Sequence, residues 1–484
     1  TQTELGAGTK RLDKETMEKV DALNLPGIHF IDAVNRSYPV TPYSSNLIGF
    51  ASYDEDEQKI VGKMGLESTL NDVLSGKDGL KAYQRTIYGD ILPGTEIIYE
   101  QAEDGNNVVL TLDSNLQTTV ESAMKETMLL NNAKRAWCIV MECETGNILA
   151  WASYPTFDQN THEEIPNYTD NISEMSYEPG SVMKTFTYAT ALDTGVFPEN
   201  TKYRAGQFDY GYDPNTGKIN RVDGIETGYP TIRDALGNDY GTLTFEDGFA
   251  HSSNVGICEL LANYIQYKQF DKYLDKFGFF QTVDAPFISE VTGWKSLDIP
   301  MGYLSSGFGQ ASSITVLQLA QAYTAIFNDG KMVKPHVVSA IVDSTTGQPI
   351  ETYDTEVVGT PITKETANKM CTMMRHVLDE GMSGERFKID GVDMIAKTGT
   401  GEIYDEETHT YSTDTFTSSI MAAAPYDDPK IMVYWGMIST NYLNYSPIQF
   451  QQIMQAALIA NNINGNEVAT KSEEQEGWET YVMP

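Results

Sequence analysis

Three short motifs, far apart in the chain, constrain its fold more than any other feature of the sequence. A serine precedes a lysine by three positions at Ser181–Lys184, a Ser-x-Asn motif lies at Ser252–Asn254, and a Lys-Thr-Gly motif lies at Lys397–Gly399. Together these residue types supply a hydroxyl nucleophile, amines that can move protons and groups that can bind a substrate. They can cooperate only in a fold that brings the three segments within hydrogen-bond distance of one another.

A second Ser-x-x-Lys motif competes for the role of nucleophile, and sequence context decides between the two. Ser122–Lys125 lies inside a helix predicted over residues 116–130. Ser181 instead follows the turn-forming Glu178-Pro179-Gly180 and begins a helix predicted over residues 181–194. A serine at the start of a helix is exposed, and the positive end of the helix favours developing negative charge. Ser181 is therefore the predicted nucleophile.

Lys184 is the candidate base for this serine. Residues three apart lie on the same face of a helix, so the amine of Lys184 can reach the hydroxyl of Ser181. The amine must lose its proton to act as a base, and burial beside another cation such as Lys397 would lower its pKa. The alternative is that Lys184 is an ordinary solvated lysine on a helix, and this interpretation would be preferred if the residue were considered alone.

The second motif precedes a helix predicted over residues 255–265. A loop at this point can present the hydroxyl of Ser252 and the amide of Asn254 to a cleft. The hydroxyl could relay a proton to a leaving amine, and the amide could hold a substrate carbonyl. Serine and asparagine are also preferred helix caps, which is the better interpretation if this motif stands alone.

The third motif is predicted to lie on the edge strand of a sheet beside the site. It follows the apolar residues 392–396 and precedes a predicted acidic loop over residues 402–414. Gly399 would let a substrate backbone approach the strand closely. A lysine before a β-turn is the plainer alternative for a single Lys-Thr-Gly motif.

The residues around this strand also suggest how a substrate could be held. The hydroxyls of Thr398 and Thr400 could bind a terminal carboxylate together with Lys397. The backbone N–H groups of Ser181 and Thr400 would form an oxyanion hole, typically worth ~3–4 kcal/mol of the barrier per donor.

The remaining pattern predicts one mostly antiparallel sheet covered by helices, an α+β arrangement. Two hairpins are expected, one from residues 136–142 and 147–153 and one from residues 418–424 and 430–438, with a final helix over residues 446–462. Residues 203–241, rich in Gly, Asp and Tyr, are expected to form a long surface excursion.

Composition excludes several classes of function. The net charge is −35, from 33 basic and 68 acidic residues, which argues against nucleic acid as a partner. No apolar run approaches the ~18–20 residues that a membrane helix requires. The four cysteines are expected to pack as small apolar side chains, and the six histidines have no metal-ligand spacing, so neither metal nor cofactor is expected.

The ordered trio of motifs resembles the penicillin-binding proteins, and longer stretches narrow the resemblance to the class B, high-molecular-mass transpeptidases. The matching stretches are residues 305–310, 315–323 and 328–336 downstream, and residues 36–49 and 65–79 upstream. The resemblance extends from about Leu25 to Asn462. It implies a penicillin-binding transpeptidase fold, in which an antiparallel sheet covered by helices and an all-helical subregion follow an elongated N-terminal pedestal.

The resemblance also implies an activity, that of a serine D,D-transpeptidase that cross-links peptidoglycan stem peptides. Ser181 would attack the carbonyl between two terminal D-alanines, and an amine of a neighbouring stem would take the acyl group. β-Lactams would acylate the same serine. The residues expected to carry the chemistry are Ser181, Lys184, Ser252, Asn254 and Lys397, with Thr398, Gly399 and Thr400 binding substrate.

Other functions remain open at this point. A D,D-carboxypeptidase or a β-lactamase would use the same site with water as acceptor. A β-lactamase needs a deacylating base, and Glu259 with Asn263 has a suitable spacing but lies on the same predicted helix as the second motif. From a different class, the chain could be a sensor that β-lactams acylate, or a scaffold for division proteins.

The expected organisation is a pedestal or dimerisation-type domain over residues 1–105, truncated at its start, a transpeptidase domain over residues 106–468, and an acidic tail over residues 469–484. The cytoplasmic tip and membrane anchor typical of the class are not visible, so we expect an ectodomain that a missing N-terminal anchor holds on the extracytoplasmic face of a bacterial membrane. A glycosyltransferase and other cell-wall machinery are the expected partners of the pedestal.

Overall fold

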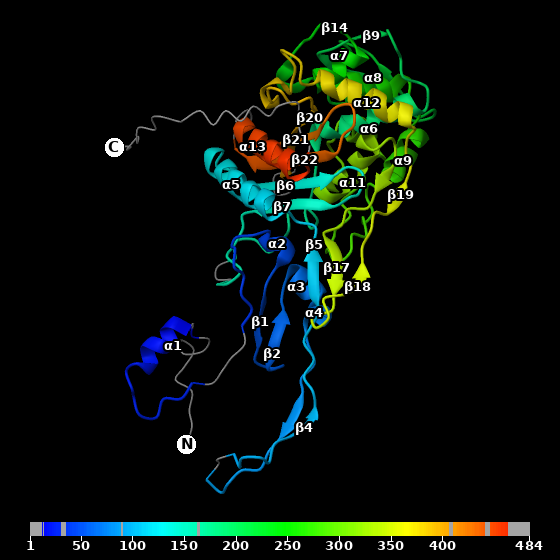
Figure 1. Ribbon diagram of the computed structural model, residues 1–484. Helices are drawn as coiled ribbons and strands as arrows, with labels where there is room; N and C mark the ends of the chain where they lie inside the picture. The colour runs from blue at the N-terminus through cyan, green and yellow to red at the C-terminus, as the bar shows by residue number, and fades with distance from the viewer. Residues whose placement is uncertain are drawn as a thin grey trace, which may run out of the picture.

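The computed structural model describes residues 12, 14–30, 35–88, 91–161, 165–405, 410–440 and 446–462. A larger body sits on an elongated N-terminal pedestal (Figure 1). The predicted acidic tail, residues 469–484, lies outside the described residues. No helix within the described ranges is long and apolar enough to cross a membrane.

A five-stranded antiparallel sheet in the order β20-β21-β22-β6-β7 forms the centre of the body. Both predicted hairpins are confirmed as pairs of neighbours in this sheet. The strands are β6 (Arg135–Glu142), β7 (Ile148–Tyr154), β20 (Ile395–Asp405), β21 (Thr410–Ala424) and β22 (Ile431–Ser439). The strand that carries the Lys-Thr-Gly motif, β20, is an edge strand as predicted.

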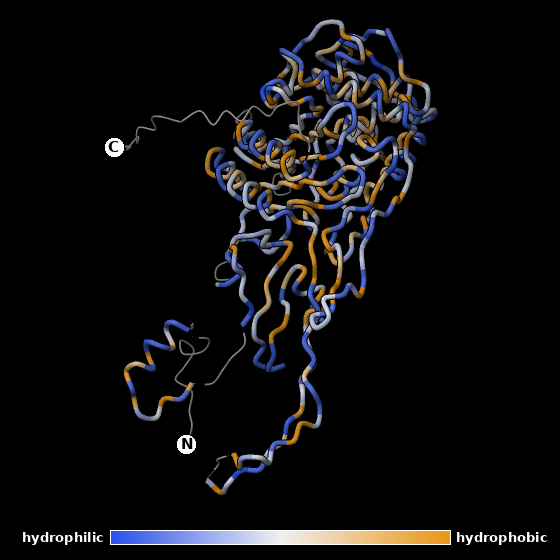
Figure 2. Tube along the Cα trace, viewed as in Figure 1, coloured by the Kyte–Doolittle hydropathy of each residue, from blue (hydrophilic) through white to orange (hydrophobic). Residues whose placement is uncertain are grey.

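Apolar side chains alternate between two cores on the opposite faces of this sheet. Along β6, Trp137 and Ile139 belong to one core, whereas Cys138 and Val140 belong to the other. The second core is closed by α5 (Ser114–Leu130) and α13 (Pro447–Ala460), which pack on the sheet and on each other. Figure 2 shows the apolar residues concentrated along these strands and helices.

The first core lies under the helical region, which contains the all-helical subregion that was predicted. Its helices are α6 (Lys184–Asp193), α7 (Phe245–Ala250), α8 (Asn254–Asn263), α9 (Tyr267–Lys276), α10 (Pro300–Gly307), α11 (Val316–Phe327), α12 (Lys364–His376) and the 3-10 turns η2 (Gly180–Met183) and η3 (Ala235–Gly237). A further 3-10 turn, η4 (Glu385–Phe387), packs on α13 in the second core. Every residue of α11 is buried, as expected for a helix surrounded by others. On α6, Phe186 makes edge-to-face contacts with Phe277, Phe279 and Tyr323.

Two expectations about loops need revision. The region 203–241 is largely exposed, as expected, but it is not irregular: it forms short paired strands whose inward side chains, including Tyr203, Phe208 and Ile232, are buried. The pairs are β9 (Lys202–Arg204) with β14 (Thr242–Thr244), β10 (Gln207–Phe208) with β13 (Ile232–Arg233), and β11 (Tyr210–Asp213) with β12 (Lys218–Arg221). Most of the predicted acidic loop 402–414 instead extends β20 and β21, because pairing satisfies the backbone there; residues 406–409 lie outside the described residues.

The pedestal is built from short elements. They are α1 (Lys14–Asp21), α2 (Ser45–Ile48), β1 (Ala51–Asp54), β2 (Lys59–Gly62), α3 (Gly65–Thr69), α4 (Asn71–Leu74), β3 (Leu80–Ala82), β4 (Ile97–Glu100) and β5 (Asn107–Leu110). Two of the segments that carry the upstream resemblance meet here, since Arg36 pairs with the buried Glu67 at 2.7 Å.

The pedestal joins the body through a three-stranded sheet in the order β18-β17-β5, in which β17 (Val338–Val342) and β18 (Pro349–Thr352) come from the later part of the chain (Figure 1). Two further pairs, β8 (Ser176–Tyr177) with β15 (Ile314–Thr315) and β16 (Met332–Val333) with β19 (Val357–Gly359), lie in the body. The division of the chain after residue 105 stays a prediction.

Candidate active site

The predicted nucleophile lies where the chain passes from β8 into a helix. Ser181 is half-buried in the 3-10 turn η2, which continues directly into α6. We call Glu178–Ser181 the nucleophile loop. It is held between two other backbone segments, β20 on one side and the turn Gly309–Ala311, called the rear turn, on the other.

Glycines allow these three segments to approach closely. The N–H of Gly180 donates to the carbonyl of Gly309 at 2.9 Å. A Cβ on Gly309 would lie 2.0 Å from the Gly180 carbonyl oxygen, and a Cβ on Gly180 would lie 2.5 Å from the Thr400 carbonyl oxygen. Both glycines have positive φ, +87° and +64°, so no other residue fits either position without strain.

Lys184 lies one helical turn beyond Ser181 and is completely buried, which excludes the solvated helix lysine. Its Nζ lies 2.9 Å from Ser181 Oγ, 2.5 Å from the carbonyl oxygen of Ser252 and 3.3 Å from Ser252 Oγ. The amine therefore contacts both the nucleophile and the second motif.

The third motif joins the same network through Lys397. This lysine is also completely buried, and its Nζ donates to Ser252 Oγ at 2.8 Å and to the Thr398 carbonyl at 3.0 Å. Ser252 adopts a left-handed backbone conformation, with φ +61°, that places its side chain between the two lysines. The three distant motifs thus meet in one hydrogen-bonded chain from Ser181 to Lys184, Ser252 and Lys397.

Burial makes the neutral form of both lysines accessible. It lowers the pKa of Lys184 to about 7, and the partly compensating charge of Asp234 acts in the opposite direction. Burial also holds the pKa of Lys397 well below its usual range, and the nearby charge of Lys184 lowers it further. A neutral Lys184 can accept a proton from Ser181, which a fully charged lysine cannot.

The helix cap at the second motif is provided by the residue between its two named members. Ser253 is the N-cap of α8, and its Oγ accepts the N–H of Gly256 at 3.0 Å. The buried carboxylate of Asp234 in turn accepts from Ser253 Oγ and from the N–H of Val255. Capping by Ser253 leaves Ser252 to face the lysines. The side chain of Asn254 donates to the Arg233 carbonyl at 2.9 Å, which fixes its orientation.

On β20, the residues after Lys397 lie beside the nucleophile loop. The hydroxyl of Thr398 donates to Ser383 Oγ at 3.1 Å, and Ser383 donates in turn to the Ala250 carbonyl, just before the second motif. A Cβ on Gly399 would lie 2.3 Å from Ser419 Oγ on the neighbouring strand. A side chain at this position would displace the Ser419 hydroxyl and approach the Pro179 carbonyl oxygen to 3.2 Å, a packing constraint that the sequence did not suggest.

The competing copy of the first motif has no place in this arrangement. Ser122 and Lys125 are exposed on α5, on the far side of the sheet from the helical region. Among the described residues, no cluster of three His, Cys, Asp or Glu side chains could hold a metal ion. All four cysteines are buried and unbridged, as expected for small apolar side chains.

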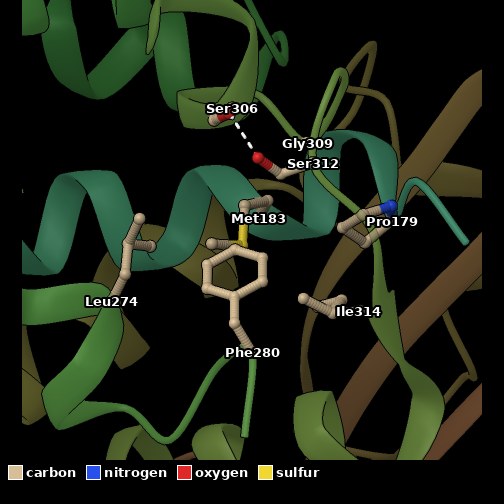
Figure 3. Close-up of a pocket in the computed structure, with 8 residues that line it drawn as sticks. All are labelled: Pro179, Met183, Leu274, Phe280, Ser306, Gly309, Ser312 and Ile314. Atoms are coloured by element: carbon tan, nitrogen blue, oxygen red, sulfur yellow. Dashed lines mark hydrogen bonds between the residues drawn. The ribbon is translucent and has the colours of Figure 1, made fainter. Parts of the chain in front are cut away.

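A small cavity of about 10 Å³ lies behind the nucleophile, next to the turn η2 (Figure 3). Pro179 and Met183 line it from the nucleophile side, and Phe280 and Ile314 face them. The volume is about that of one water molecule, so the cavity is too small for a substrate. The helix that carries Ser181 is thus packed from behind almost without gaps.

Sequence reasoning missed four residues that shape the site: Asp234, Gly309, Ser383 and Glu178. None of them belongs to a motif with its own chemical signature. Gly309 lies in a stretch noted only for its resemblance, and Glu178 was noted only as part of a turn.

Comparison with known proteins identifies the family. The pattern described as "Penicillin binding protein transpeptidase domain" matches residues 136–464, more than half of the chain. The chain belongs to the penicillin-binding protein family. A second pattern, described as "Penicillin-binding Protein dimerisation domain", matches residues 2–110, so the order of domains is that of the class B proteins. The fold class predicted from the sequence is confirmed.

Relatives and solved structures agree with this assignment. PbpB of Mycolicibacterium smegmatis is 29% identical over 82% of this chain and 60% of its own length. PenA of Neisseria gonorrhoeae, named a probable peptidoglycan D,D-transpeptidase, is 27% identical over 88% of this chain and 67% of its own length. Penicillin-binding protein 2X of Streptococcus thermophilus shares the fold with a TM-score of 0.77 and 27% identity, covering 93% of this chain and 66% of that one. This penicillin-binding protein thus spans only part of the length of each.

Proposed function

We propose that this penicillin-binding protein is a serine D,D-transpeptidase that cross-links peptidoglycan stem peptides. The observation that carries the proposal is the buried Lys184, whose amine lies 2.9 Å from Ser181 Oγ and also contacts Ser252. A stem peptide that ends in two D-alanines is the donor substrate, and a β-lactam reacts as its mimic.

In the acylation step, neutral Lys184 takes the proton of Ser181 as Oγ attacks the carbonyl between the two D-alanines. The negative charge that develops on the carbonyl oxygen is placed between the nucleophile loop and β20. Backbone N–H groups of Ser181 and Thr400 are the proposed donors to it, and one such donor typically contributes ~3–4 kcal/mol.

The tetrahedral intermediate collapses when the D-alanine nitrogen receives a proton and leaves. Ser252 Oγ is the proposed relay, because it lies 3.3 Å from the Lys184 amine and 2.8 Å from the Lys397 amine. The proton taken from Ser181 can thus reach the leaving group without passing through solvent. An acyl-enzyme on Ser181 remains.

Recognition of the donor relies on local positive charge in an acidic protein. The hydroxyls of Thr398 and Thr400, with Lys397, are proposed to bind the terminal carboxylate. An arriving carboxylate favours the charged form of Lys397. Asn254, held by the Arg233 carbonyl, is proposed to donate to a backbone carbonyl of the peptide, and Gly399 to let that peptide lie close to β20.

The molecule that accepts the acyl group distinguishes the possible enzymes: a transpeptidase uses an amine, and a hydrolase uses water. A hydrolase of the β-lactamase type needs a free carboxylate beside the acyl group. Glu259 does not supply one, because its oxygens are bound by Arg221 at 2.6 Å and by Asn263 at 2.6 Å. The acceptor is therefore proposed to be an amine of a second stem peptide.

Covalent labelling tests the chemistry. Incubation with a penicillin, followed by intact mass spectrometry, should add one drug mass to the wild type and to the matched control Ser122→Ala, but none to Ser181→Ala. A persistent adduct agrees with a transpeptidase, and rapid turnover of the penicillin would establish a β-lactamase. Absence of an adduct on folded wild-type protein would rule the proposal out.

A role as an acylated sensor or a division scaffold is tested in cells. If Ser181→Ala supports growth as well as the wild type does, the scaffold hypothesis is favoured over the enzyme. We also propose that a glycosyltransferase and other cell-wall proteins bind the pedestal, and that an N-terminal anchor holds the protein on the extracytoplasmic face of the membrane. Co-purification of a glycosyltransferase with the body alone would contradict the first of these.

A further inference from the structure

Glu178, three residues before the nucleophile, occupies an unusual position that the reaction described above does not use. Its carboxyl oxygen Oε1 accepts the N–H of Ala311 at 3.0 Å and the hydroxyl of Tyr411 at 3.2 Å. Ala311 belongs to the rear turn, and Tyr411 lies on β21, where the β20–β21 hairpin extends beyond the Lys-Thr-Gly motif. One carboxyl group therefore connects both structures that hold the nucleophile loop.

The backbone around Glu178 also contacts both of these structures. The carbonyl oxygen of Glu178 faces Gly401 on β20, where an added Cβ would approach it to 3.2 Å. Gly180 is bonded to Gly309 of the rear turn. The side chain of Glu178 thus ties the nucleophile loop, to which it belongs, to the rear turn and to the hairpin whose strand β20 flanks the proposed oxyanion site.

We propose that Glu178 is a positioning residue that clamps the nucleophile loop between the rear turn and the β20–β21 hairpin, and that ionisation of its carboxyl group slows acylation. The proposal rests on the acyl-transfer function given above. In the neutral state the carboxyl group still accepts both hydrogen bonds. In the ionised state it adds a buried negative charge beside the place where the oxyanion develops.

The surroundings of the carboxyl group favour its neutral form. Its second oxygen, Oε2, is buried and has no hydrogen-bond partner within the described part of the chain. The ionisable groups that face it are Tyr411 on β21 and the exposed Glu402 on β20, and the rear turn contributes none. The pKa of Glu178 is raised to about 7, mainly by burial; the charge of Glu402 acts in the same direction, and the hydrogen bonds from Tyr411 and Ala311 oppose it.

The test is the pH dependence of acylation by a fluorescent penicillin, between about pH 5.5 and 9. The wild-type rate should rise as Lys184 loses its proton and fall as Glu178 ionises. Glu178→Gln keeps the accepting carbonyl but cannot ionise, so its rate should rise to a plateau without the fall. Glu178→Ala loses both hydrogen bonds and should be acylated at least about tenfold more slowly at every pH.

Glu290→Gln is the matched control, because Glu290 is also a partly buried carboxyl with raised pKa that accepts two backbone N–H groups, those of Val283 and Ala285. Its pH profile should equal that of the wild type. A fall at high pH that persists in Glu178→Gln, or wild-type rates in Glu178→Ala, would overturn the proposal.

Thermal unfolding provides a readout that needs no acylation. The pKa of Glu178 is about 7 in the folded protein and about 4.3 in an unfolded chain, so ionisation destabilises the fold progressively as pH rises between these values. The Tm of Glu178→Gln minus that of the wild type should therefore increase from pH 5 to pH 8. A Tm difference that stays constant with pH would refute the role of Glu178 as a buried clamp. If the wild type shows the expected unfolding behaviour but is never acylated, the proposed function is refuted instead.

Discussion

At the scale of single residues, the proposed chemistry depends on the amine of Lys184, because burial lowers its pKa toward neutral pH. Lys184 has no exposed surface, and its amine contacts Ser181 and Ser252, the two groups with which it is proposed to exchange a proton. Because its pKa is lowered to about 7, a substantial fraction of the molecules carry a neutral amine near neutral pH.

Replacement of this amine should abolish acylation while leaving the nucleophile in place. We expect Lys184→Met to lower the rate of penicillin acylation by about 10²–10⁴-fold, the usual contribution of a general base. Lys184→Arg should be equally slow, since a guanidinium does not lose its proton. Stopped-flow acylation kinetics measure the effect, and Lys125→Met, at the exposed competing motif, is the control. Near wild-type kinetics for the arginine variant would exclude Lys184 as the base.

At the scale of elements, the nucleophile is placed by three backbone segments rather than by its own helix alone. The nucleophile loop passes between β20 and the rear turn, and Gly180 and Gly309 have no side chains that would separate them. The geometry of the proposed oxyanion site therefore depends on packing behind the serine as well as on α6.

A methyl group on the rear turn should displace the nucleophile loop. In Gly309→Ala the new Cβ would meet the Gly180 carbonyl at 2.0 Å, so we expect acylation to slow by at least about tenfold, with a lower Tm. Gly217→Ala is the matched control, because Gly217 also has positive φ, +70°, but open space around it. The control should show only backbone strain of about 1 kcal/mol and wild-type acylation. Equal acylation rates in the two variants would contradict this account.

At the scale of the whole molecule, pedestal and body are joined by a buried polar cluster as well as by the sheet of β5 and β17. Glu121 on α5 accepts the N–H of Ser44 at 2.8 Å, and it also accepts from Gln117 and from the hydroxyl of Tyr154. Ser44, from the pedestal, donates in return to the Trp151 carbonyl. Burial raises the pKa of Glu121 above its ordinary value, and the hydrogen bonds from Tyr154, Ser44 and Gln117 partly oppose this shift.

Loss of this carboxyl should loosen the junction between the two parts. Glu121→Ala leaves the buried N–H of Ser44 without an acceptor, whereas Gln117 keeps the Trp151 carbonyl and Tyr154 keeps the backbone carbonyl of residue 121. We expect the substitution to lower the free energy of unfolding by about 1–3 kcal/mol. Because the folded pKa is raised above the unfolded value, wild-type stability relative to Glu121→Gln should decline as pH rises from about 4.3. Urea denaturation at pH 5 and pH 8 measures both effects. Ser122→Ala, exposed on the same helix, should change stability by less than about 0.5 kcal/mol, and a similar small change in Glu121→Ala would contradict the prediction.

The sequence alone determined the local elements and the chemical inventory. Helical spacing placed Lys184 within reach of Ser181, and alternating apolar residues predicted the two hairpins of the sheet. Turn residues marked where the helical segment begins, although its first turn, which holds Ser181, is the 3-10 turn η2 and α6 starts only at Lys184. These are properties of neighbouring residues, which local propensity and periodicity report directly.

Only the tertiary structure decided how those parts meet. No local pattern states that Ser252 lies between two buried lysines, that Ser253 rather than its neighbours caps α8, or that Gly309 supports the nucleophile from behind. The lowered pKa of each lysine and the raised pKa of Glu178 arise from burial by segments distant in the chain. Desolvation depends on three-dimensional packing, so the reactivity of the site is a property of the fold and not of any single motif.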